Sequence, residues 1–450
     1  MNMRQRLKVL LVIEQCNPEF TSVPLVGYNF FRTIAQLADV TLVTHQRNAR
    51  ALEKTHPHAS IVYMSEHPWV SRYSRVTAKI SKINGKVNWP LYHALKYPIY
   101  AEFNYKVHQT FKDAIERGEY DIVHTLTPMM PRYPVKVIQA CKSTPFVLGP
   151  VNGGVPFPKG FRETAKKENA RLNFLRAVGR WLIPGYRQTY QKADRILSGS
   201  TYTLSLLAEL FPDTADRLEL FCENGIDRSF LESEPAAKST DKINLLFVGR
   251  LVPYKCADIV LQAIDRLSPT LKEKVQLTIV GQGPEQTKLE SLTQELNLSD
   301  RVCFTGWVPQ SETLDYYRQA DIFCFPSIRE FGGAVVLEAM SCGLPCIVVN
   351  HGGIGEYVSE ETGFKIDPIS REHVTQQVAE SLAALIENED RRAKMSAMAL
   401  ERVKDFVWET KAQKMVAIYE ELLQRPKTAR SAEPVGATWN RDVADASLRG

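Results

Sequence analysis

Two glutamates, Glu330 and Glu338, flank a glycine-marked turn at Gly332 and Gly333. A strand is predicted just before the turn, at Ile322 to Phe325, and a helix just after it. The first N–H groups of a helix have no partner inside the helix, so they favour an anionic ligand. Carboxylates accept strong hydrogen bonds from hydroxyl groups. Together these groups suit a sugar joined to a nucleotide diphosphate. The simpler alternative is a solvated helix residue at Glu338 and a dipole-favoured charge at Glu330.

Two cations follow another predicted strand, at Asn244 to Val248. Gly249 and Arg250 come directly after this strand, and Lys255 lies just before the next predicted helix. A guanidinium fork and an ammonium point charge at the carboxyl end of a strand can hold a diphosphate between them. Surface salt bridges of little energetic value are the alternative.

Glycines also follow the next predicted strand, at Gln276 to Val280. Gly281 and Gly283 allow the backbone to approach a ligand before a helix begins. The segment lacks the third glycine and the distal acidic residue of a dinucleotide-binding motif. The pattern therefore argues against a dehydrogenase.

Both halves of the chain alternate short apolar runs with helical patterns, which is typical of α/β layers built on parallel strands. The other strands are predicted at Val9 to Ile13, Val40 to Val43, Ile61 to Met64, Asp121 to His124, Phe146 to Leu148, Arg195 to Ser198, Arg301 to Phe304 and Cys346 to Val349. Helices are predicted at 28–37, 105–116, 257–267, 284–296, 311–319 and 334–342. We expect an α/β protein of two Rossmann-like, doubly wound domains that face each other across a cleft, with ligands beyond the carboxyl ends of the strands.

Composition divides the chain further. We expect an N-terminal domain at 1–231, a polar linker at 232–243 and a C-terminal domain at 244–410. The amphipathic stretch 411–424 is predicted to be a helix that packs back on the N-terminal domain. Residues 425–450 are polar and lack periodicity, so a disordered tail is expected.

The composition is that of an ordinary globular protein. The 450 residues suffice for two or three domains, with 44% hydrophobic and 24% charged residues. The apolar runs have the length of strands, and the first one, Leu7 to Ile13, reaches Glu14 without a cleavage site. Neither a transmembrane helix nor a secretory signal is therefore predicted. The eight cysteines lack a zinc-site spacing, which favours reduced thiols and a cytoplasmic location.

Basic residues are concentrated in the first half of the chain. Residues 71–110 contain seven Lys or Arg, seven aromatic residues and one acid. A second basic stretch, 159–195, carries an apolar stripe formed by Leu172, Leu175, Val178 and Leu182, with Trp181 alongside. This combination suits an anionic membrane surface. A solvated basic face over a buried apolar stripe is the alternative. Nucleic acid is not an expected partner, because no recognised binding module accompanies the charge.

In order and spacing, the motifs of the second half resemble the donor domain of the retaining, nucleotide-sugar glycosyltransferases known as family four, which have the two-domain GT-B fold. The matching residues are Gly249-Arg250, Lys255, Gly281-Gln-Gly-Pro284, Phe304-Thr-Gly-Trp307, Ala320 to Ser327, Glu330 to Glu338 and Gly352 to Glu356. The resemblance is dense from Asn244 to Val358, and Asn224 to Asp227 also fits.

The resemblance implies a role for each matching position. Arg250 and Lys255 would hold the donor diphosphate and stabilise the charge on the leaving group. Glu338 would bind the ribose diol, and Glu330 would face hydroxyls of the transferred sugar. The donor-binding glycines would be Gly249, Gly281, Gly283, Gly332 and Gly333. The order Arg-Glu-Phe-Gly-Gly departs from the commoner Glu-Gly-Phe-Gly, which leaves the phosphate contacts open but keeps the glutamate spacing.

The first half resembles the family less. His124, at the carboxyl end of a predicted strand, would be the histidine that helps to bind the donor sugar, and a satisfied structural histidine is the alternative. Gly27 precedes a predicted helix, although the family's double-glycine loop is missing. The run Phe146 to Gly154 is similar to a Gly-Pro-x-x-Gly-Gly loop of one branch of the family. Candidates for the acceptor side are therefore Gly27, Asn152, Gly153 and Gly154, with a tight structural turn as the alternative for the last three.

The chain contains no Asp-x-Asp pair, the usual metal carrier of the other large glycosyltransferase fold. The resemblance implies transfer without a metal or other cofactor, with cations and a helix dipole in place of the metal. It also implies retention through a same-face reaction, in which the leaving phosphate receives the acceptor proton. Glu330 would then position and stabilise the sugar without becoming a covalent nucleophile.

Three other classes fit parts of the pattern. A sugar-nucleotide epimerase needs a nicotinamide motif or a catalytic acid pair, and a glycan phosphorylase is longer and uses a pyridoxal-linked lysine. A non-catalytic nucleotide-sugar-binding subunit would keep Arg250, Lys255 and Glu338. We predict a glycosyltransferase that uses a nucleotide-diphosphate sugar and a glycan or lipid-linked acceptor, in surface polysaccharide or glycolipid biosynthesis at the cytoplasmic membrane face.

Overall fold

The computed structural model describes residues 6–83, 86–88, 91–92, 95–168, 180, 182–231 and 242–425. The chain divides into two compact units. Unit 1 comprises residues 1–154, 169–223 and 411–450, and unit 2 comprises residues 155–168 and 224–410. Most of the predicted linker, the predicted tail from 426 onward and the predicted stripe at Leu172, Leu175, Val178 and Trp181 lie outside the described residues.

Unit 1 is built on a parallel sheet, whose strand order within the described residues is β3-β2-β1-β6-β7-β8-β9. The central strands are mostly apolar because both faces of a parallel sheet are covered. The order reverses between β1 and β6, and such a switch point places a crevice beyond the carboxyl ends of the strands. The strands are β1 (Lys8–Val12), β2 (Asp39–His45), β3 (Ile61–Met64), β6 (Ile122–Thr125), β7 (Phe146–Val151), β8 (Arg195–Ser198) and β9 (Leu218–Leu220).

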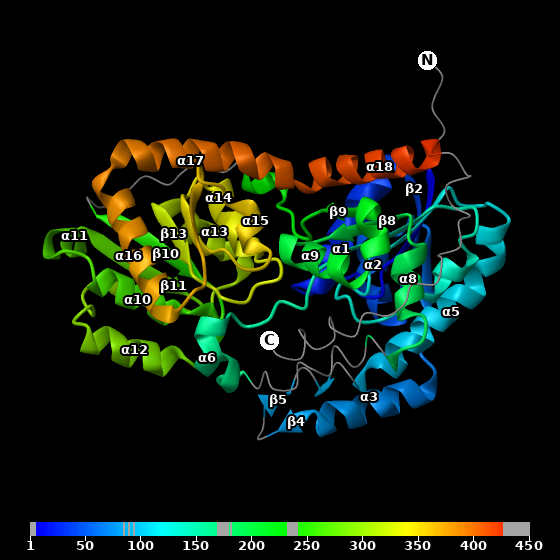
Figure 1. Ribbon diagram of the computed structural model, residues 1–450, viewed down its shortest axis with the longest axis horizontal. Helices are drawn as coiled ribbons and strands as arrows, with labels where there is room; N and C mark the ends of the chain where they lie inside the picture. Colours follow the sequence, from blue (N-terminus) through cyan, green and yellow to red (C-terminus); the bar gives the residue numbers. More distant parts are fainter. Residues whose placement is uncertain are drawn as a thin grey trace, which may run out of the picture. The chain divides into compact units, whose positions relative to one another are not determined.

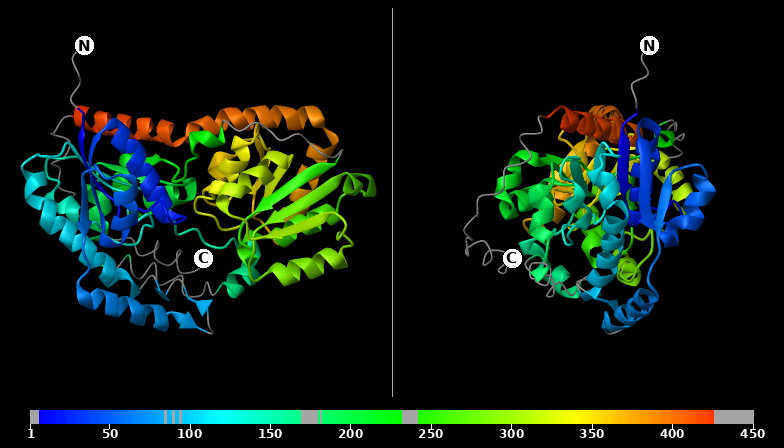
Figure 2. Two further views of the ribbon diagram at one scale, coloured as in Figure 1. Left: turned by 180° about the vertical axis from the view of Figure 1, so that it is seen from behind. Right: turned by 90° about the vertical axis from the view of Figure 1, so that its right-hand side faces the viewer.

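One face of this sheet carries a core of branched and aromatic side chains. Val12, Val43 and Val123 from three neighbouring strands join Phe103 and Val107 of α5 in that core. The helices of unit 1 are α1 (Val23–Leu37), α2 (Ala49–Thr55), α3 (Pro68–Ile80), α5 (Tyr97–Glu116), α8 (Tyr186–Lys192), α9 (Thr201–Leu210) and, from Lys411 onward, α18 (Trp408–Gln424). The short antiparallel pair β4 (Lys82–Ile83) and β5 (Lys86–Val87) follows α3. Together with α3 it stands apart from the parallel sheet in each view (Figure 1, Figure 2).

Unit 2 contains a second parallel sheet, with the order β12-β11-β10-β13-β14-β15 in the described residues. Here the switch point lies between β10 and β13, which are paired directly. The strands are β10 (Ile243–Val248), β11 (Val275–Val280), β12 (Val302–Gly306), β13 (Ile322–Phe325), β14 (Cys346–Val349) and β15 (Gly363–Ile366).

The helices of unit 2 cover this sheet, and α10 packs beside α16 (Figure 1). They are α6 (Arg162–Lys167), α10 (Ala257–Asp265), α11 (Pro269–Glu273), α12 (Gln286–Glu295), α13 (Gln310–Gln319), α14 (Ala334–Ser341), α15 (Ile354–Tyr357), α16 (Arg371–Glu387) and α17 (Glu389–Val403). The two doubly wound, Rossmann-like units confirm the predicted α/β class.

Several bounds differ from the predicted ones for identifiable reasons. Helices α1 and α5 begin earlier than predicted, and each has a proline in its first turn, where the missing N–H costs nothing. The edge strands β9 and β15 were not predicted, because β9 is three residues long with an acidic centre and β15 begins at a glycine, so neither forms an apolar run. Residues 155–168 and 224–231, expected in the first domain, belong to unit 2. Gly160, for example, packs so closely that an added Cβ would lie 2.1 Å from the Ile369 carbonyl oxygen.

Candidate active site

The predicted cations and glutamates of unit 2 gather at its switch point. Arg250 follows β10, Lys255 ends a single 3₁₀ turn (Pro253–Lys255), and Glu330 follows β13. The two loops are tied together, because the Ile328 N–H donates to the Tyr254 carbonyl oxygen at 3.0 Å. Groups separated by 75 residues in the sequence therefore meet at the carboxyl edge where ligands bind in such sheets.

Lys255 and Glu330 form an ion pair. The Lys255 Nζ donates to Glu330 Oε2, and the two side chains are only 13% and 16% exposed. The ammonium also lies 4.6 Å from the ring centroid of Phe325, in cation–π geometry. In this ion pair the two opposite charges neutralise each other, and each side chain fixes the orientation of the other.

Arg250 is exposed and keeps most of its hydrogen-bonding capacity. Its Nη2 donates to the Tyr254 hydroxyl at 3.1 Å, and the described residues place no carboxylate within ion-pair distance of it. The alternative of a surface salt bridge therefore does not hold for Arg250. A guanidinium has five N–H donors, so donors remain for an anion.

A pocket of about 650 Å³ opens beside Arg250, at the ends of β10, β11 and β12. Trp307, whose side chain is 67% exposed, forms part of its wall. The lining residues are Val248, Gly249, Arg250, Val280, Gly281, Gln282, Gly283, Gln286, Trp307, Val308 and Thr313. The pocket brings together four of the predicted site residues and offers an aromatic surface next to a cation.

The glycines of this pocket serve packing between loops. An added Cβ at Gly281, where φ is 132°, would lie 2.1 Å from the Gly249 carbonyl oxygen. A Cβ at Gly283 would lie 2.3 Å from the Leu251 carbonyl oxygen. The loops after β10 and β11 therefore lie against each other, a closeness that only glycine permits. The sequence interpretation assigned these glycines to ligand approach and did not foresee this contact.

Glu338 is buried on α14, with an exposure of 6%. The Tyr317 hydroxyl donates to its Oε2 at 2.8 Å. Burial, reinforced by the Glu338 carboxylate, raises the pKa of Tyr317, so the phenol stays a neutral donor. The alternative of a solvated helix residue is therefore wrong for Glu338, which is held in a fixed orientation.

The turn between the glutamates depends on contacts that exclude side chains. Gly333 caps α14 in the left-handed region with φ of 62°, and an added Cβ would lie 2.8 Å from Glu330 Cγ. From the other side, the Gly353 N–H donates to the Glu330 carbonyl oxygen at 3.1 Å. A Cβ at Gly352 would lie 2.0 Å from that same oxygen. Glu330 is thus positioned by the Gly352-Gly353 segment, which sequence matching found but could not place.

Arg329 is a residue that the sequence interpretation missed. Its guanidinium lies 4.9 Å from the ring centroid of Phe157 and 5.7 Å from that of Phe331. Its buried Nε has no hydrogen-bond partner in the described residues, and burial lowers the pKa of the group. Arg329 adds a third cation to the site, and the only sequence signal for it was its place beside Glu330.

His124, predicted as a catalytic residue, is fully buried in unit 1. Its Nδ1 lies 2.6 Å from the Tyr419 hydroxyl and its Nε2 lies 2.6 Å from the Gly149 carbonyl oxygen. Burial lowers the pKa of His124 to about 4. With both ring nitrogens bonded and no exposed surface, the ring has no contact left for a substrate. The geometry fits the structural alternative, and we omit His124 from the proposed catalytic residues.

The residues predicted for the acceptor side are packed inside unit 1. Asn152 is 1% exposed, and its Oδ1 accepts from the Ser200 hydroxyl at 2.9 Å and the Thr203 hydroxyl at 3.0 Å. The Gly153 N–H donates to Thr203 Oγ1, and Gly154 has a left-handed φ of 80°. These contacts fit the alternative of a structural turn.

Gly27 does not precede a helix as predicted, because it lies inside α1. An added Cβ there would lie 2.4 Å from the Gln15 carbonyl oxygen, so the helix packs directly on the loop after β1. The prediction failed because Pro24 starts the helix before the apolar pattern becomes clear.

Two further observations concern the described residues. They contain no group of three or more His, Cys, Asp or Glu side chains arranged to hold a metal ion. None of their helices combines the length and apolarity needed to cross a membrane.

Solved glycosyltransferase structures share the fold. The structure of Anabaena HepE in complex with UDP superposes with a TM-score of 0.57 at 17% identity, covering 92% of this chain and 100% of that one. The lipopolysaccharide outer core galactosyltransferase WaaB gives a TM-score of 0.61 at 14% identity, with 92% and 100% coverage. This likeness covers both Rossmann-like units and shows the two-domain GT-B fold of these glycosyltransferases.

Sequence comparison identifies the family. Residues 230–402 match the family described as glycosyl transferases group 1. The D-inositol 3-phosphate glycosyltransferase of Thermobispora bispora is 30% identical over 306 residues, which cover 63% of this chain and 68% of the relative. The enzyme of the same name from Kribbella flavida is 29% identical, over 52% of this chain and 58% of the relative. The chain is a glycosyltransferase and belongs to the glycosyl transferases group 1 family.

Proposed function

We propose that this enzyme transfers a sugar from a nucleotide-diphosphate sugar to a glycan or lipid-linked acceptor, with retention of anomeric configuration and without a metal ion. The proposed role lies in surface polysaccharide or glycolipid biosynthesis, at the cytoplasmic face of the membrane. The observation that carries the proposal is the convergence of Arg250, Lys255 and Glu330 beside the Trp307 pocket at the unit 2 switch point.

The site has the parts that a nucleotide sugar requires. Trp307 offers a face for a planar base, and Arg250 lies in the same pocket to meet the diphosphate. Lys255 and Glu330 lie next along the carboxyl edge, where the phosphate bound to the sugar and the sugar hydroxyls would follow. Glu338 and the first turn of α14 complete the set with a buried carboxylate and N–H groups.

The ion pair supports a mechanism without a glycosyl-enzyme intermediate. The Glu330 carboxylate already accepts a hydrogen bond from Lys255, which makes it a weaker nucleophile than a free carboxylate. Lys255 and Arg250 would stabilise the charge that develops on the departing phosphate, in the place where other enzymes use a metal. The leaving phosphate would take the acceptor proton on the same face of the sugar.

The comparisons suggest which substrates to test first. HepE was solved with UDP, so UDP sugars come first among donors. The relatives are named for D-inositol 3-phosphate, so a phosphorylated cyclitol belongs beside glycan and lipid-linked acceptors in any screen.

Helix α3 supports the membrane part of the proposal. Its exposed apolar residues Trp69, Val76 and Ile80 are 44%, 50% and 59% exposed and are spaced to lie on one side of the helix. A basic row runs beside this apolar row and is formed by Arg72, Arg75 and Lys79, with no acidic residue in α3. An apolar row flanked by cations suits a bilayer surface that carries anionic headgroups.

A thermal-shift panel tests the donor site. Wild type, Arg250→Ala and Lys255→Ala are heated with UDP, GDP, ADP and their common sugars, with and without EDTA. We expect one nucleotide to stabilise the wild type by about 2.7 kcal/mol at 100 times its Kd, and both variants to lose most of this gain. A shift in both variants equal to that of the wild type would refute the donor site. A separate turnover assay with and without EDTA tests metal independence, and loss of turnover with EDTA would refute it. The anomeric configuration of the product, read by proton NMR coupling constants, tests retention.

A further inference from the structure

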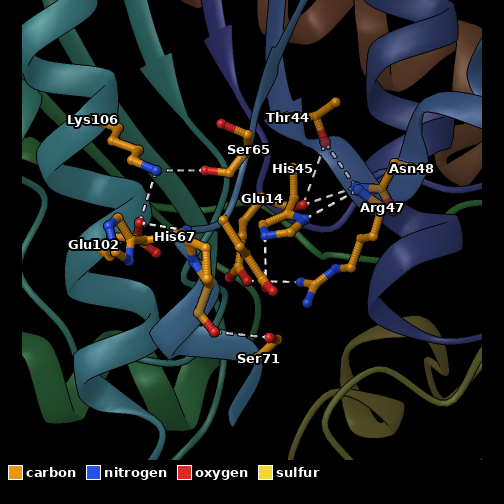
Figure 3. A network of polar contacts seen from close by, with 12 residues as sticks. Glu14, Thr44, His45, Arg47, Asn48, Ser65, His67, Ser71, Glu102 and Lys106 are labelled. Carbon is orange, nitrogen blue, oxygen red and sulfur yellow. Dashed lines mark hydrogen bonds and ion pairs between the residues drawn. The ribbon is translucent and has the colours of Figure 1, made fainter. Parts of the chain in front are cut away.

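The carboxyl edge of the unit 1 sheet carries a second polar cluster. None of its residues was among the predicted site residues. Glu14 follows β1, His45 ends β2 and Glu66 follows β3. Figure 3 shows the Glu14, His45 and Arg47 side chains converging from these elements. The Glu14 Oε1 lies 2.7 Å from Arg47 Nη2, and the Glu66 Oε1 lies 2.8 Å from His45 Nε2.

The cluster stands at the switch point of its sheet, as the Arg250 site does in unit 2. The Glu14 N–H donates to Thr127 Oγ1, beyond β6, at 2.7 Å. The Glu14 carbonyl oxygen accepts from Asn48 Nδ2 at 2.9 Å. Glu14 is therefore fixed between the ends of β1, β2 and β6, at the crevice that the strand order creates.

Glu66 is held in place but remains open to a ligand. The residues on either side are anchored to α5, because Lys106 Nζ donates to the Ser65 carbonyl oxygen at 2.6 Å and the His67 N–H donates to Glu102 Oε1 at 2.9 Å (Figure 3). The Glu66 side chain is still 29% exposed, and His45 is its only partner in the described residues. A carboxylate has about four acceptor positions, so several are left.

His45 acts as a positioning residue for Glu66. Its Nδ1 accepts from the Arg47 N–H at 3.1 Å, which leaves the proton on Nε2, pointing to Glu66. Burial, followed by the charge of Arg47, lowers the pKa of His45, so the ring is neutral near pH 7. Its ring also stacks on Phe103 at 6.4 Å between centroids. The ring cannot swing away without losing all three contacts.

Two neighbouring features suit a polyhydroxylated ligand. The Thr125 hydroxyl, at the end of β6, is buried and has no hydrogen-bond partner in the described residues. Residues two apart in a strand lie on the same face, so Thr125 shares the face of Val123 and His45 shares that of Val43. Val123 and Val43 belong to one core, which places Thr125 and His45 on the same face of the sheet. Tyr100 and Tyr133 stack at 5.1 Å between centroids, and the Glu14 charge raises the pKa of both after burial. Sugars present both hydroxyls and an apolar ring face, so carboxylates beside phenols match them.

We propose that this cluster is the acceptor site, where Glu14 and Glu66 bind adjacent hydroxyls of a sugar or cyclitol. The assignment rests on the proposed function for the identity of its ligand as an acceptor. It replaces Gly27 and Asn152 to Gly154, which are occupied by internal packing, and it makes Glu66 the residue that selects hydroxyl-rich acceptors. Arg47, whose side chain is 43% exposed, stands where a charged substituent on the ring would meet it.

Direct binding tests the proposal without requiring turnover. Saturation-transfer NMR and titration with myo-inositol, glucose, galactose and N-acetylglucosamine are run on wild type, a Glu14→Gln/Glu66→Gln variant and Glu119→Gln. Glu119 is a matched control, because it is exposed, pairs with Arg117 and precedes the opposite end of β6. We expect at least one probe to bind wild type and the control equally and to bind the double variant at least tenfold more weakly.

Two results would overturn the acceptor site: equal binding of that probe to wild type and double variant, or no binding of any probe to wild type. A His45→Asn variant gives a second reading, since loss of positioning should weaken the same probe while the Glu66 charge remains. The UDP thermal shift is measured on the same samples. An unchanged shift in the double variant separates failure at this cluster from failure of the donor site.

Discussion

Lys255 and His124 show how burial decides what a polar residue can do. Lys255 lies in the loop after β10, pairs with Glu330 and keeps a side-chain exposure of 13%, so a ligand can still reach the ammonium group. His124 has both nitrogens bonded in the interior, where burial keeps it neutral. The sequence marked both as candidate catalytic residues, and only their contacts in the structure separated them.

The pH dependence of stability tests the role of His124. Its pKa is about 4 in the folded protein and 6.5 as the ordinary value, so the unfolded chain takes up the proton first as the pH falls. The free energy of unfolding should therefore fall between about pH 6.5 and 4, by up to about 3 kcal/mol from this group. Urea unfolding of wild type and His124→Gln at pH 7 and 4.5 measures it. The difference in the free energy of unfolding between wild type and His124→Gln should be smaller at pH 4.5 than at pH 7. An equal difference at both pH values would contradict the structural role of His124.

At the scale of elements, each site depends on the loops that follow the strands at the carboxyl edge of the sheet. Both switch points place a carboxylate and a cation directly beyond neighbouring parallel strands, Glu330 with Lys255 and Glu14 with Arg47. The loop after β13 is further constrained by Gly352, whose backbone lies against it.

Gly352 offers a test of this backbone contact. In Gly352→Ala, the new Cβ would meet the Glu330 carbonyl oxygen and the left-handed φ of 78° would be strained. Strain of that kind costs about 1–2 kcal/mol per residue, and displacement of Glu330 should also lower donor affinity at least tenfold. Gly118→Ala is the control, because its φ is 74° and nothing lies within 4 Å of an added Cβ. Urea melts and titration with a UDP sugar that binds the wild type should show strain alone in the control and both losses in Gly352→Ala.

Helix α3 makes a separate prediction about membranes. Replacing Trp69, Val76 and Ile80 with serine removes the exposed apolar row, so partition onto phosphatidylglycerol vesicles at low salt should drop about tenfold or more. Sedimentation with vesicles measures this, and 0.5 M salt should weaken the wild type through its basic row. A matched triple replacement of the exposed Ile369, Leu400 and Leu423 is the control. An equal loss of vesicle binding in both triple variants would mean that α3 is not a specific membrane-binding element.

At the scale of the whole molecule, the chain passes between the two units more than once. Residues 155–168 belong to unit 2 although unit 1 both precedes and follows them in the sequence, and unit 1 is completed by residues of α18. Within unit 1, Tyr419 of α18 reaches His124 and Glu421 reaches Arg195. A chain shortened within α18 would therefore lose core contacts of the unit in which the polypeptide begins.

Hydrogen exchange with and without UDP tests the division of labour between the units. At 100 times its Kd, UDP should slow exchange in β10, β13 and α14 by an amount that corresponds to as much as about 2.7 kcal/mol. The sugar or cyclitol found in the binding screen should instead protect the ends of β1, β2 and β3. Protection by UDP confined to unit 1 would reverse the proposed assignment.

Much of the fold was predictable because its strands are buried on both faces. β8, β13 and β14, whose residues are all buried, have the predicted bounds, since such a run needs no further context. The glutamate pair and the two cations were likewise found from residue type and spacing. Arg329, the Glu14 cluster and the strands β9 and β15 were not found, because no local pattern marks residues whose partners lie far away in the sequence.

By itself, the sequence determined the α/β class, two doubly wound sheets and a glycosyltransferase donor motif at Arg250, Lys255, Glu330 and Glu338. These features depend on local periodicity and on the spacing of residues within short segments. Only the tertiary structure decided that His124 and Asn152 are internal and that Lys255 is paired with Glu330. It alone also brought Glu14, His45 and Glu66 together, because strand order sets which loop ends are neighbours and burial sets which of their groups a ligand can reach.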